Sequence, residues 1–262
     1  MINFEFKKSL GQNFINDENI IDKIVKCADV DKDTLVIEVG PGAGVLSKKI
    51  IPLSGYTVLY EIDTRLREIL NDELKENDNY EIIFNDVLKQ NVKDDISRFN
   101  YKKIYVVSNL PYYITTPIIT KLIDEVNPDK IVIMIQEEVA DRLCAIVGSK
   151  EYAMITVSLG SKYDIRKLFR VSRHCFTPAP NVDSAVISLD KHNKYEIKDE
   201  VFFDKFIKDA FKFKRKNLKN NLKGYDLIKI EEILVKKNYS LSDRAEVIPI
   251  DLFVEIVNSI YK

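Results

Sequence analysis

The sequence predicts an α/β fold with a mostly parallel sheet, followed by a small all-helical C-terminal domain. Short apolar segments of three to five residues recur in the first half of the chain, and helical segments separate them. Strands that alternate with helices indicate βαβ units, whose strands are parallel. Beyond residue 190 every apolar pattern has helical spacing, as in Phe202, Phe206 and Ile207. We therefore expect one domain over residues 1–190 and a helical domain over residues 191–262.

Composition restricts the class of protein. Hydrophobic residues make up 45% and charged residues 31% of the 262 residues, which is typical of a globular chain. No apolar segment reaches transmembrane length, and the N-terminus lacks a signal-peptide pattern. The cysteines are Cys27, Cys144 and Cys175, which are too far apart and too few for a disulfide framework or a cysteine-rich metal site. We expect a cytoplasmic protein with no metal and no membrane contact.

The N-terminal residues 7–15 are basic and polar with an apolar end, which indicates an ordered arm or loop. A helix should follow, with Asn16 or Asp17 as its N-cap. Its apolar face is formed by residues at helical spacing, namely Ile20, Ile21, Ile24, Val25 and Ala28.

Four strands in this pattern end at a polar residue. The expected strands cover residues 35–37, 57–60, 81–84 and 104–107, with a fifth over 131–135 and helices near 65–74 and 137–145. The first four strands lead into Glu38, Glu61, Asp86 and Asn109, which lie 23, 25 and 23 positions apart. One βα unit separates each pair, so we expect all four side chains at the carboxyl edge of the sheet, where ligands of open α/β sheets bind.

The segment after residue 150 is less regular. Residues 152–159 fit a helix or a strand, and we favour a helix, followed by a strand near 164–171. A loop over residues 176–181 leads to a strand over 184–189. The polar stretch from Asp190 to Lys194 is then the expected domain boundary.

A glycine-rich turn, Gly40-Pro41-Gly42-Ala43-Gly44, follows the first of these strands. Such a turn lets a ligand approach the backbone and exposes N–H groups at a helix start. It is neither a dinucleotide fingerprint, which would need a glycine at Val45, nor a P-loop. Glu61 is placed to bind a ribose diol and Asp86 an adenine amino group, so a nucleoside without a diphosphate fits, and S-adenosylmethionine is the commonest such cofactor. The alternative interpretations are a surface acid for Glu61 and a helix cap for Asp86.

The tetrapeptide Asn109-Leu110-Pro111-Tyr112 follows a buried strand, which Pro111 terminates. The Asn109 side-chain oxygen and a backbone carbonyl freed by Pro111 can accept the two hydrogens of an adenine amino group, and Tyr112 can stack on the base. Two such acceptors would stabilise the positive charge that develops on the nitrogen when it attacks an electrophile. The competing interpretation is an ordinary strand-to-loop turn with two core aromatics.

Six segments together resemble the rRNA adenine dimethyltransferases, and the branch that acts on small-subunit rRNA matches best. They are residues 8–14, 38–44, 109–113, 176–184, 214–222 and 244–246, so the resemblance covers nearly the whole chain. One departure is Ser108, where the family more often has a smaller residue or Asn. The macrolide-resistance (Erm) branch, which acts on large-subunit rRNA, is the nearest alternative. A second alternative is a ribosome-assembly factor that acts mainly by binding RNA.

The resemblance implies a Rossmann-like class I methyltransferase with a seven-stranded sheet. It implies dimethylation of two adjacent adenines near the 3′ end of small-subunit rRNA within an immature subunit, and we expect a monomer. Catalytic positions carried over from the family are Asn109, Leu110, Tyr112 and Phe176, the last as a clamp on the target base. A buried core role for Phe176 remains open beside the clamp. The implied cofactor contacts are Asn13, Ile15, Gly40, Glu61, Asp86 and Asn109.

A basic segment lies in the helical domain. From Lys205 to Lys223 there are eight basic residues and one acid, Asp209, although the whole chain has a net charge of −1. Acidic partners at helical spacing are almost absent, which argues against an ordinary solvated lysine face. We expect phosphate contacts with rRNA, made largely from one face of a helix, by Lys212, Lys214, Arg215, Lys216, Lys219 and Lys223.

Overall fold

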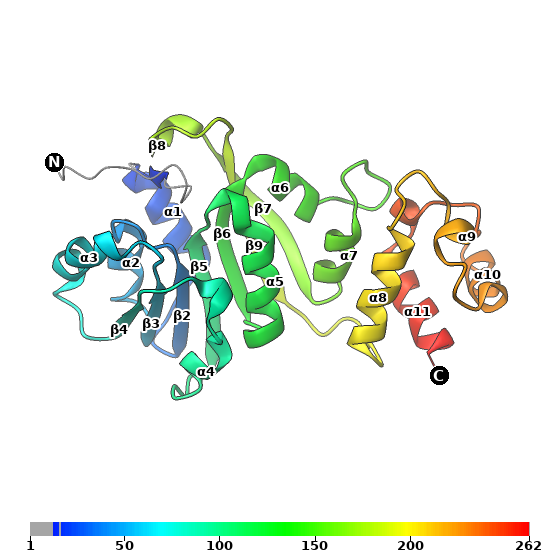
Figure 1. The fold of residues 1–262 in the computed structure, drawn as a ribbon, viewed down its shortest axis with the longest axis horizontal. Coiled ribbons are helices and arrows are strands. Elements are labelled where there is room, and N and C mark those ends of the chain that lie inside the picture. The colour runs from blue at the N-terminus through cyan, green and yellow to red at the C-terminus, as the bar shows by residue number, and fades with distance from the viewer. Residues whose placement is uncertain (1–12, 16, 262) are drawn as a thin grey trace. The chain divides into compact units, whose positions relative to one another are not determined.

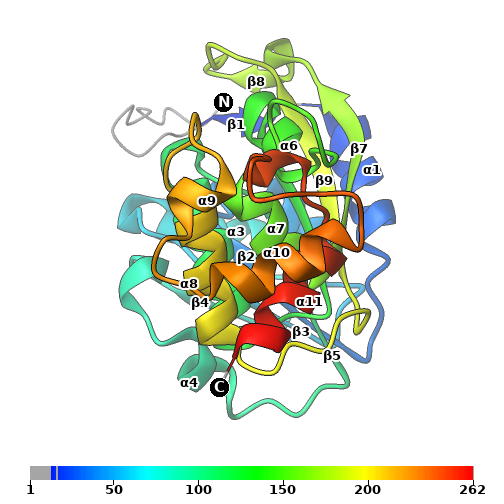
Figure 2. The same cartoon turned by 90° about the vertical axis from the view of Figure 1, so that its right-hand side faces the viewer.

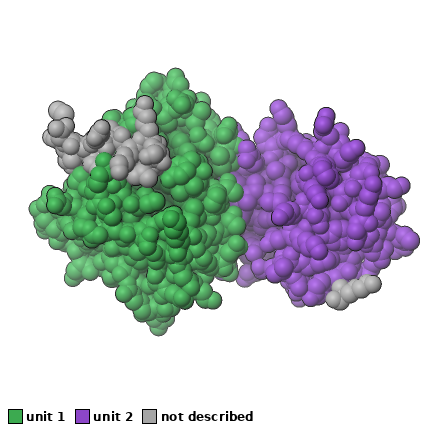
Figure 3. Space-filling view, in the orientation of Figure 1, with its two compact units in different colours: residues 1–140, 166–190 green, residues 141–165, 191–262 purple. Residues whose placement is uncertain are grey.

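The computed structural model describes residues 13–15 and 17–261, and its chain forms two compact units. Unit 1 comprises residues 1–140 and 166–190, and unit 2 comprises residues 141–165 and 191–262 (Figure 3). The expected domain boundary near residue 190 coincides with one of the points at which the chain passes from unit 1 to unit 2. Residues 141–165, which the sequence analysis assigned to the first domain, pack within the helical unit instead. Their helix, Met154–Gly160, packs against the helix Glu200–Ala210 of the same unit.

Seven strands within the described residues form one sheet in the order β4-β3-β2-β5-β6-β9-β7. The strands are β2 (Thr34–Val39), β3 (Tyr56–Tyr60), β4 (Tyr80–Ile83), β5 (Lys103–Asn109), β6 (Lys130–Gln136), β7 (Tyr163–Val171) and β9 (Ser184–Lys191). Strands β2 to β6 pair in parallel, and β9 pairs antiparallel with β6. The predicted seven-stranded, mostly parallel sheet is confirmed. The strand order reverses between β2 and β5, because the chain proceeds outward from β2 through β3 to β4 and then returns to β5.

The sheet is buried by helices that follow its strands. Helices α1 and α2 share a core cluster with Val36, Val107 and Val132, which lie on one face of the sheet. Alternation along each strand turns the neighbouring Val106 and Ile133, both buried, to the opposite face. The helices of unit 1 are α1 (Glu18–Ala28), α2 (Val45–Ile50), α3 (Arg67–Leu74), α4 (Val92–Ile96) and α5 (Thr115–Val126) (Figure 1). Helix α6 (Glu137–Leu143) begins in unit 1 and ends in unit 2.

The predicted first helix is confirmed as α1. Asp17 caps it by accepting a hydrogen bond from the Asn19 N–H at 2.9 Å, and Ile21, Ile24 and Ala28 are its buried residues. The other candidate cap, Asn16, lies outside the described residues, as does most of the expected arm. The end of that arm forms the two-residue strand β1 (Phe14–Ile15), which pairs antiparallel with β8 (Phe176–Thr177).

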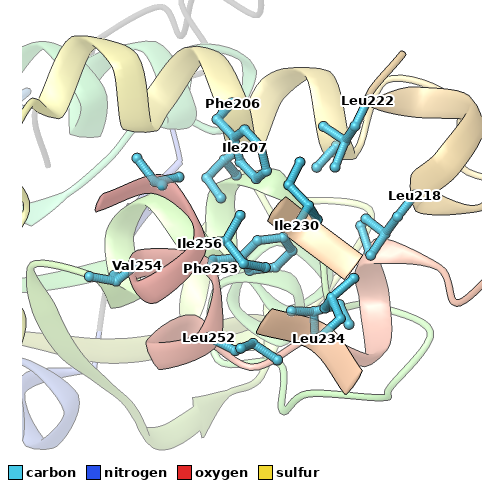
Figure 4. Close-up of a cluster of buried hydrophobic side chains, with 14 of the residues drawn as sticks. Phe206, Ile207, Leu218, Leu222, Ile230, Leu234, Leu252, Phe253, Val254 and Ile256 are labelled. Atoms are coloured by element: carbon cyan, nitrogen blue, oxygen red, sulfur yellow. The ribbon is translucent and has the colours of Figure 1, made fainter. Parts of the chain in front are cut away.

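Unit 2 is built from helices, and its segment 152–159 is helical as predicted. Its helices are α7 (Met154–Gly160), α8 (Glu200–Ala210), α9 (Leu218–Asn221), α10 (Leu227–Val235) and α11 (Ile250–Ile260). Phe206 and Ile207 from α8, Ile230 from α10 and Phe253 from α11 meet in one buried cluster (Figure 4). Most helical stability in proteins comes from packing of this kind, because short isolated helices are marginal in water.

The basic segment does not form one helix, so the prediction of a single helical face over residues 211–223 is wrong. Helix α8 ends at Ala210, residues 211–217 form turns, and α9 begins after Asn217. The Asn217 side chain accepts from the Asn220 N–H at 3.1 Å, which caps α9. The Asn221 amide donates to the carbonyls of Ala210 and Phe213, at 2.7 and 3.3 Å. The two Asn221 hydrogen bonds therefore hold the turn, and the Asn217 cap starts a new helix after it. Residue spacing had suggested one continuous helix instead.

Two absences concern only the residues that the structure describes. None of their helices is both long and apolar enough to cross a bilayer. No group of three His, Cys, Asp or Glu side chains among them is arranged to hold a metal ion, and Cys27, Cys144 and Cys175 form no disulfide with one another.

Candidate functional site

A pocket in unit 1 lies at the carboxyl ends of β2, β3, β4 and β5, where the strand order reverses. Ligands of open α/β sheets bind at such a switch point. The four polar residues that the sequence placed in register, Glu38, Glu61, Asp86 and Asn109, all line it. So do the other predicted cofactor contacts and two of the catalytic positions, namely Asn13, Ile15, Gly40, Leu110 and Tyr112. The pocket thus gathers every predicted site residue of unit 1 except Phe176.

The glycine turn forms one wall of this pocket. Gly40 and Gly42 have φ values of +72° and +60°, which side-chain-bearing residues rarely adopt. A Cβ at Gly42 would also lie 2.5 Å from the ring of Phe14, so the turn and the end of the N-terminal arm pack directly together. Gly44 then caps α2, whose first N–H groups face this turn.

Glu61 is a buried carboxylate held by backbone donors. It is 4% exposed, and its two oxygens accept hydrogen bonds from the N–H of Gly42 at 3.1 Å and of Asp63 at 2.8 Å. Burial raises the pKa of Glu61, while these N–H groups act in the opposite direction by stabilising the charged form. Each carboxylate oxygen has a second lone pair, so the fixed carboxylate can still accept from two hydroxyl groups of a ligand.

Glu38 lies beside Glu61 and was not assigned a role from the sequence. It is 1% exposed and accepts a hydrogen bond from the Ser47 hydroxyl at 2.7 Å. Burial, with a smaller contribution from the nearby Glu61 charge, raises the pKa of Glu38 to about 8. At neutral pH Glu38 is therefore mainly a neutral acid, which lets it sit next to a second carboxylate.

Two further residues fix the strand ends around the pocket. The buried Ser108 hydroxyl donates to the Val39 carbonyl and accepts from the Val39 N–H at 3.2 Å, which joins β5 to the end of β2. This is the position at which the sequence departs from the family pattern. Asp86 follows β4 and accepts from the Leu88 N–H at 3.0 Å as the cap of a short 3-10 helix. Asp86 thus has the predicted cap contact and also lines the pocket.

The Asn109-Leu110-Pro111-Tyr112 segment begins at the last residue of β5. The Asn109 Nδ2 donates to the Asn13 carbonyl at 3.3 Å, and the Leu110 N–H donates to the Met134 carbonyl at 3.1 Å. Pro111, with φ −64° and ψ 127°, turns the chain away from the sheet. The Tyr112 hydroxyl hydrogen-bonds to the buried Ser184 hydroxyl of β9. The amide and the aromatic ring are thereby both held in place at the pocket.

Phe176 is the predicted site residue that the pocket does not include. It is 3% exposed in β8 and packs in the same cluster as Ile15 and Ile24, below the strand pair β1–β8. A base clamp needs an accessible ring, so the clamp stays a prediction that requires this buried ring to become exposed.

The six basic residues of the predicted RNA-binding set lie in unit 2 and are all exposed. They are distributed over the turn after α8, over α9 and just beyond it, rather than on one helix. Lys212 and Lys214 have identified contacts: the Lys212 ammonium lies 5.6 Å from the centre of the Phe213 ring, and the Lys214 ammonium donates to the Lys150 carbonyl at 3.1 Å.

Several residues that line the pocket were not predicted from the sequence, among them Phe14, Ile62, Asn85 and Tyr113, besides the role of Glu38. A signal was present for three of them. Phe14 lies between Asn13 and Ile15, Asn85 precedes Asp86 and Tyr113 follows Tyr112, so all three sit beside positions already selected. Only the structure shows the strand pair that places Phe14, which joins residues more than 150 positions apart.

Comparison with known proteins agrees with this arrangement. A family model described as ribosomal RNA adenine dimethylase matches residues 3–262. A protein of Clostridioides difficile named ribosomal RNA small subunit methyltransferase A is 40% identical, covering 98% of this chain and 92% of its own. The protein of that name from Bacillus pumilus is 42% identical, with 99% and 92% covered.

Among solved structures, a dimethyladenosine transferase from Plasmodium falciparum superposes with a TM-score of 0.78 at 23% identity, covering 94% of this chain and 96% of its own. The 23S rRNA methyltransferase ErmE gives 0.75 at 21% identity, with 95% and 100% covered. These two show that the fold is shared. The family model and the 40% identical relatives show more: this chain belongs to the ribosomal RNA adenine dimethylase family.

Proposed function

We propose that this protein transfers two methyl groups in succession to the exocyclic amino group of adenine in small-subunit rRNA. Its family membership and the printed names of its relatives support this reaction. The observation that carries the proposal is the pocket at the switch point of the sheet. There a fixed amide, an anchored tyrosine ring and a buried carboxylate converge on one site.

Members of this family use S-adenosylmethionine, and the pocket suits it. Glu61 offers a fixed carboxylate for two hydroxyl groups, Gly40 lines the wall without a side chain so that a ligand can approach the backbone, and Asp86 offers an acceptor. Asn13, Ile15 and Asn109 complete the predicted contacts. When bound, this cofactor supplies an activated methyl group on a sulfonium. The protein then needs no metal and no activating base for the transfer itself.

Asn109 and Leu110 act on the adenine amino group. Because the Asn109 Nδ2 is engaged by the Asn13 carbonyl, the Oδ1 end of the amide is the end that accepts from the base. The Leu110 carbonyl, which precedes the N–H-free Pro111, accepts the second hydrogen. Two acceptors draw the nitrogen lone pair out of conjugation and stabilise the developing positive charge. Tyr112, held by Ser184, stacks on the ring.

The second transfer places a constraint on these acceptors. A monomethylated amino group has one hydrogen left, so one acceptor is sufficient and the other must leave room for the methyl group. The target adenine must also be unpaired or flipped out of a helix, because a stacked base hides its amino group. We infer two neighbouring adenines near the rRNA 3′ end as the targets, in an immature subunit.

We assign the remaining predicted roles on the same basis. Methyl transfer belongs to residues 1–190 and rRNA binding to residues 191–262, through the exposed basic residues Lys212, Lys214, Arg215, Lys216, Lys219 and Lys223. The chain acts as a monomer in the cytoplasm. A clamp by Phe176 would require its ring to leave the core cluster in which it lies.

The experiment that tests the function is methyl transfer from labelled cofactor to isolated small and large subunits, with the modified nucleotides mapped. We expect two dimethylated adenines near the 3′ end of small-subunit rRNA. Methylation of the large subunit instead would indicate an Erm-type enzyme. Tight binding to immature small subunits without any methyl transfer would indicate an assembly factor.

A further inference from the structure

Unit 2 contains a second cavity that the proposed reaction does not use. It opens between the segment before α7, the turn after α8 and the residues that precede α11. Helix α8 packs against both α7 and α9, so these segments are neighbours (Figure 2). The lining residues are mostly apolar or aromatic, with two lysines, an amide and one acid at the edges: Tyr152, Ala153, Met154, Ala210, Phe211, Phe213, Lys214, Lys216, Asn221, Ala245 and Glu246.

The inner wall of the cavity is fixed by packing. Tyr152 is 4% exposed, and its hydroxyl donates to the Ile248 carbonyl at 3.2 Å. Its ring lies 6.1 Å from that of Phe211, which in turn lies 5.9 Å from Phe253 in the core. A wall built from interlocked aromatic rings keeps its shape without a ligand.

The rim combines apolar surface with positive charge. Phe213 is 55% exposed and Met154 is 38% exposed, so both offer apolar surface to a ligand at the opening. Lys214 and Lys216 line the same opening, and the Lys212 ammonium lies 5.6 Å from the centre of the Phe213 ring. An accessible aromatic ring surrounded by cations is the arrangement with which proteins bind single-stranded nucleic acid.

Asn221 adds a polar group that lacks a partner. Both hydrogens of its amide are used by the carbonyls of Ala210 and Phe213, which fixes the amide orientation. Among the residues that the structure describes, no donor reaches the buried Asn221 Oδ1. A buried acceptor without a hydrogen bond is unfavourable, so a donor on a ligand or water in the cavity would stabilise it.

We propose that this cavity is a second nucleotide subsite, which holds one unstacked base of the rRNA on Phe213 while Lys212, Lys214 and Lys216 contact the flanking phosphates. This inference rests on the proposed function, since it takes the partner to be rRNA. It differs from plain phosphate binding because the aromatic ring and the apolar cavity require a base. A negatively charged peptide would use the lysines but would gain little from the cavity.

The test is equilibrium binding of the full chain to a single-stranded RNA heptamer, with no cofactor present. A second heptamer carries an abasic ribose at its central position. Stacking of a base on an aromatic side chain contributes about 1–3 kcal/mol, so Phe213→Ala should weaken binding of the intact heptamer about 5- to 150-fold. The unchanged protein should bind the abasic heptamer more weakly than the intact one by a similar factor. For the abasic heptamer, Phe213→Ala should then reduce the affinity little further.

Two variants serve as controls. Ile228→Ala removes a side chain of α10 that is 76% exposed, and it should leave binding unchanged. Phe213→Leu keeps apolar surface but not the ring, and it should give an intermediate affinity. Phe213 is half exposed, so neither of its substitutions should disturb folding, which thermal unfolding will check.

Equal binding of both heptamers, no loss in Phe213→Ala beyond that of Ile228→Ala, or no binding at all would overturn the subsite. Because the assay involves no methyl transfer, these results are separable from failure of the proposed function, which subunit methylation tests directly.

Discussion

The pocket of unit 1 and the basic segment of unit 2 are built in opposite ways. The pocket draws its polar residues from four βα units, and its two buried carboxylates are hydrogen-bonded: Glu61 accepts from backbone N–H groups and Glu38 from the Ser47 hydroxyl. The basic segment, Lys205 to Lys223, is one contiguous stretch whose cations are exposed to solvent. One region depends on the sheet to bring distant residues together, whereas the other depends mainly on local composition.

This difference determines how each region should respond to substitution. In a buried site a single atom is held by several others, so losing it should produce a large and specific effect. In an exposed cluster each charge acts through a screened field, so effects should be moderate, additive and dependent on salt. The following experiments test this contrast, starting with the largest expected effect.

Glu38 should make stability depend on pH. Its pKa in the folded chain is about 8, whereas a glutamate in the unfolded chain ionises near 4.5. Between these values the folded chain retains a proton that the unfolded chain releases, so stability falls as pH rises through this window and levels off above it. We expect a loss on the order of a few kcal/mol. Glu38→Gln should remove this loss, as measured by denaturant unfolding; a parallel loss in both proteins would contradict the buried neutral acid.

Asn109→Ala should reduce turnover on the order of a hundredfold or more, because one of two preorganised acceptors is lost. The measurement is the single-turnover rate on small subunits at saturating cofactor. Cofactor affinity must be determined separately by calorimetry, since Asn109 also contacts the N-terminal arm at Asn13. Near-normal turnover at saturation would remove Asn109 from the catalytic set.

Glu61→Ala should weaken cofactor binding about ten- to a hundredfold, the range of a charge-assisted hydrogen bond. The same carboxylate holds the N–H groups of Gly42 and Asp63, so part of the loss would come from the glycine turn. Glu61→Gln keeps one side-chain oxygen as an acceptor, so its loss of cofactor affinity should be smaller. Unchanged affinity in both variants, measured by calorimetry, would exclude the ribose contact.

Reversal of Arg215, Lys216 and Lys219 to Glu should weaken subunit binding and flatten its dependence on salt. Each lost phosphate contact removes about 0.7–0.9 unit from the slope of log affinity against log salt, so we expect a change of about 2–3 units. A matched control reverses Lys229, Lys236 and Lys237, which are also exposed lysines of unit 2 and lie outside the basic segment. If both triple variants shift the slope equally, the basic segment has no special role.

Ser184→Ala should have the smallest effect, about two- to tenfold in kcat/KM. It removes the hydrogen-bond partner of the Tyr112 hydroxyl while leaving the ring itself, and a neutral hydrogen bond contributes about 0.5–1.5 kcal/mol. Tyr112→Phe breaks the same hydrogen bond from the other side. The double variant should therefore be no slower than either single variant; additive losses would show that the two hydroxyl groups act independently.

The regular spacing of polar residues was sufficient to predict which edge of the sheet forms the pocket. Since parallel strands in βαβ units all end at one edge, Glu38, Glu61, Asp86 and Asn109 had to meet once the strands were assigned. The strands after residue 160 were likewise recognisable from local pattern, whereas residues 152–159 fitted a helix or a strand and the favoured helix is the one observed.

Residue spacing gave a wrong prediction where asparagine side chains form hydrogen bonds with backbone groups that a continuous helix would use. The stretch from Lys212 to Lys223 has helical periodicity, yet Asn217 and Asn221 satisfy backbone groups in a turn, and α9 is only four residues long. Periodicity reports which residues share a face if a helix forms; it does not report whether an asparagine will end the helix first.

By itself, then, the sequence determined the strand and helix order, the shared edge of the sheet and the basic character of unit 2. The tertiary structure decided the rest: the packing of Phe14 on Gly42, the core position of Phe176, the neutral state of Glu38 and the packing of residues 141–165 within the helical unit. The physical reason is range. Periodicity and capping act between near neighbours in the chain, whereas burial and long-range pairing exist only once distant segments have come together.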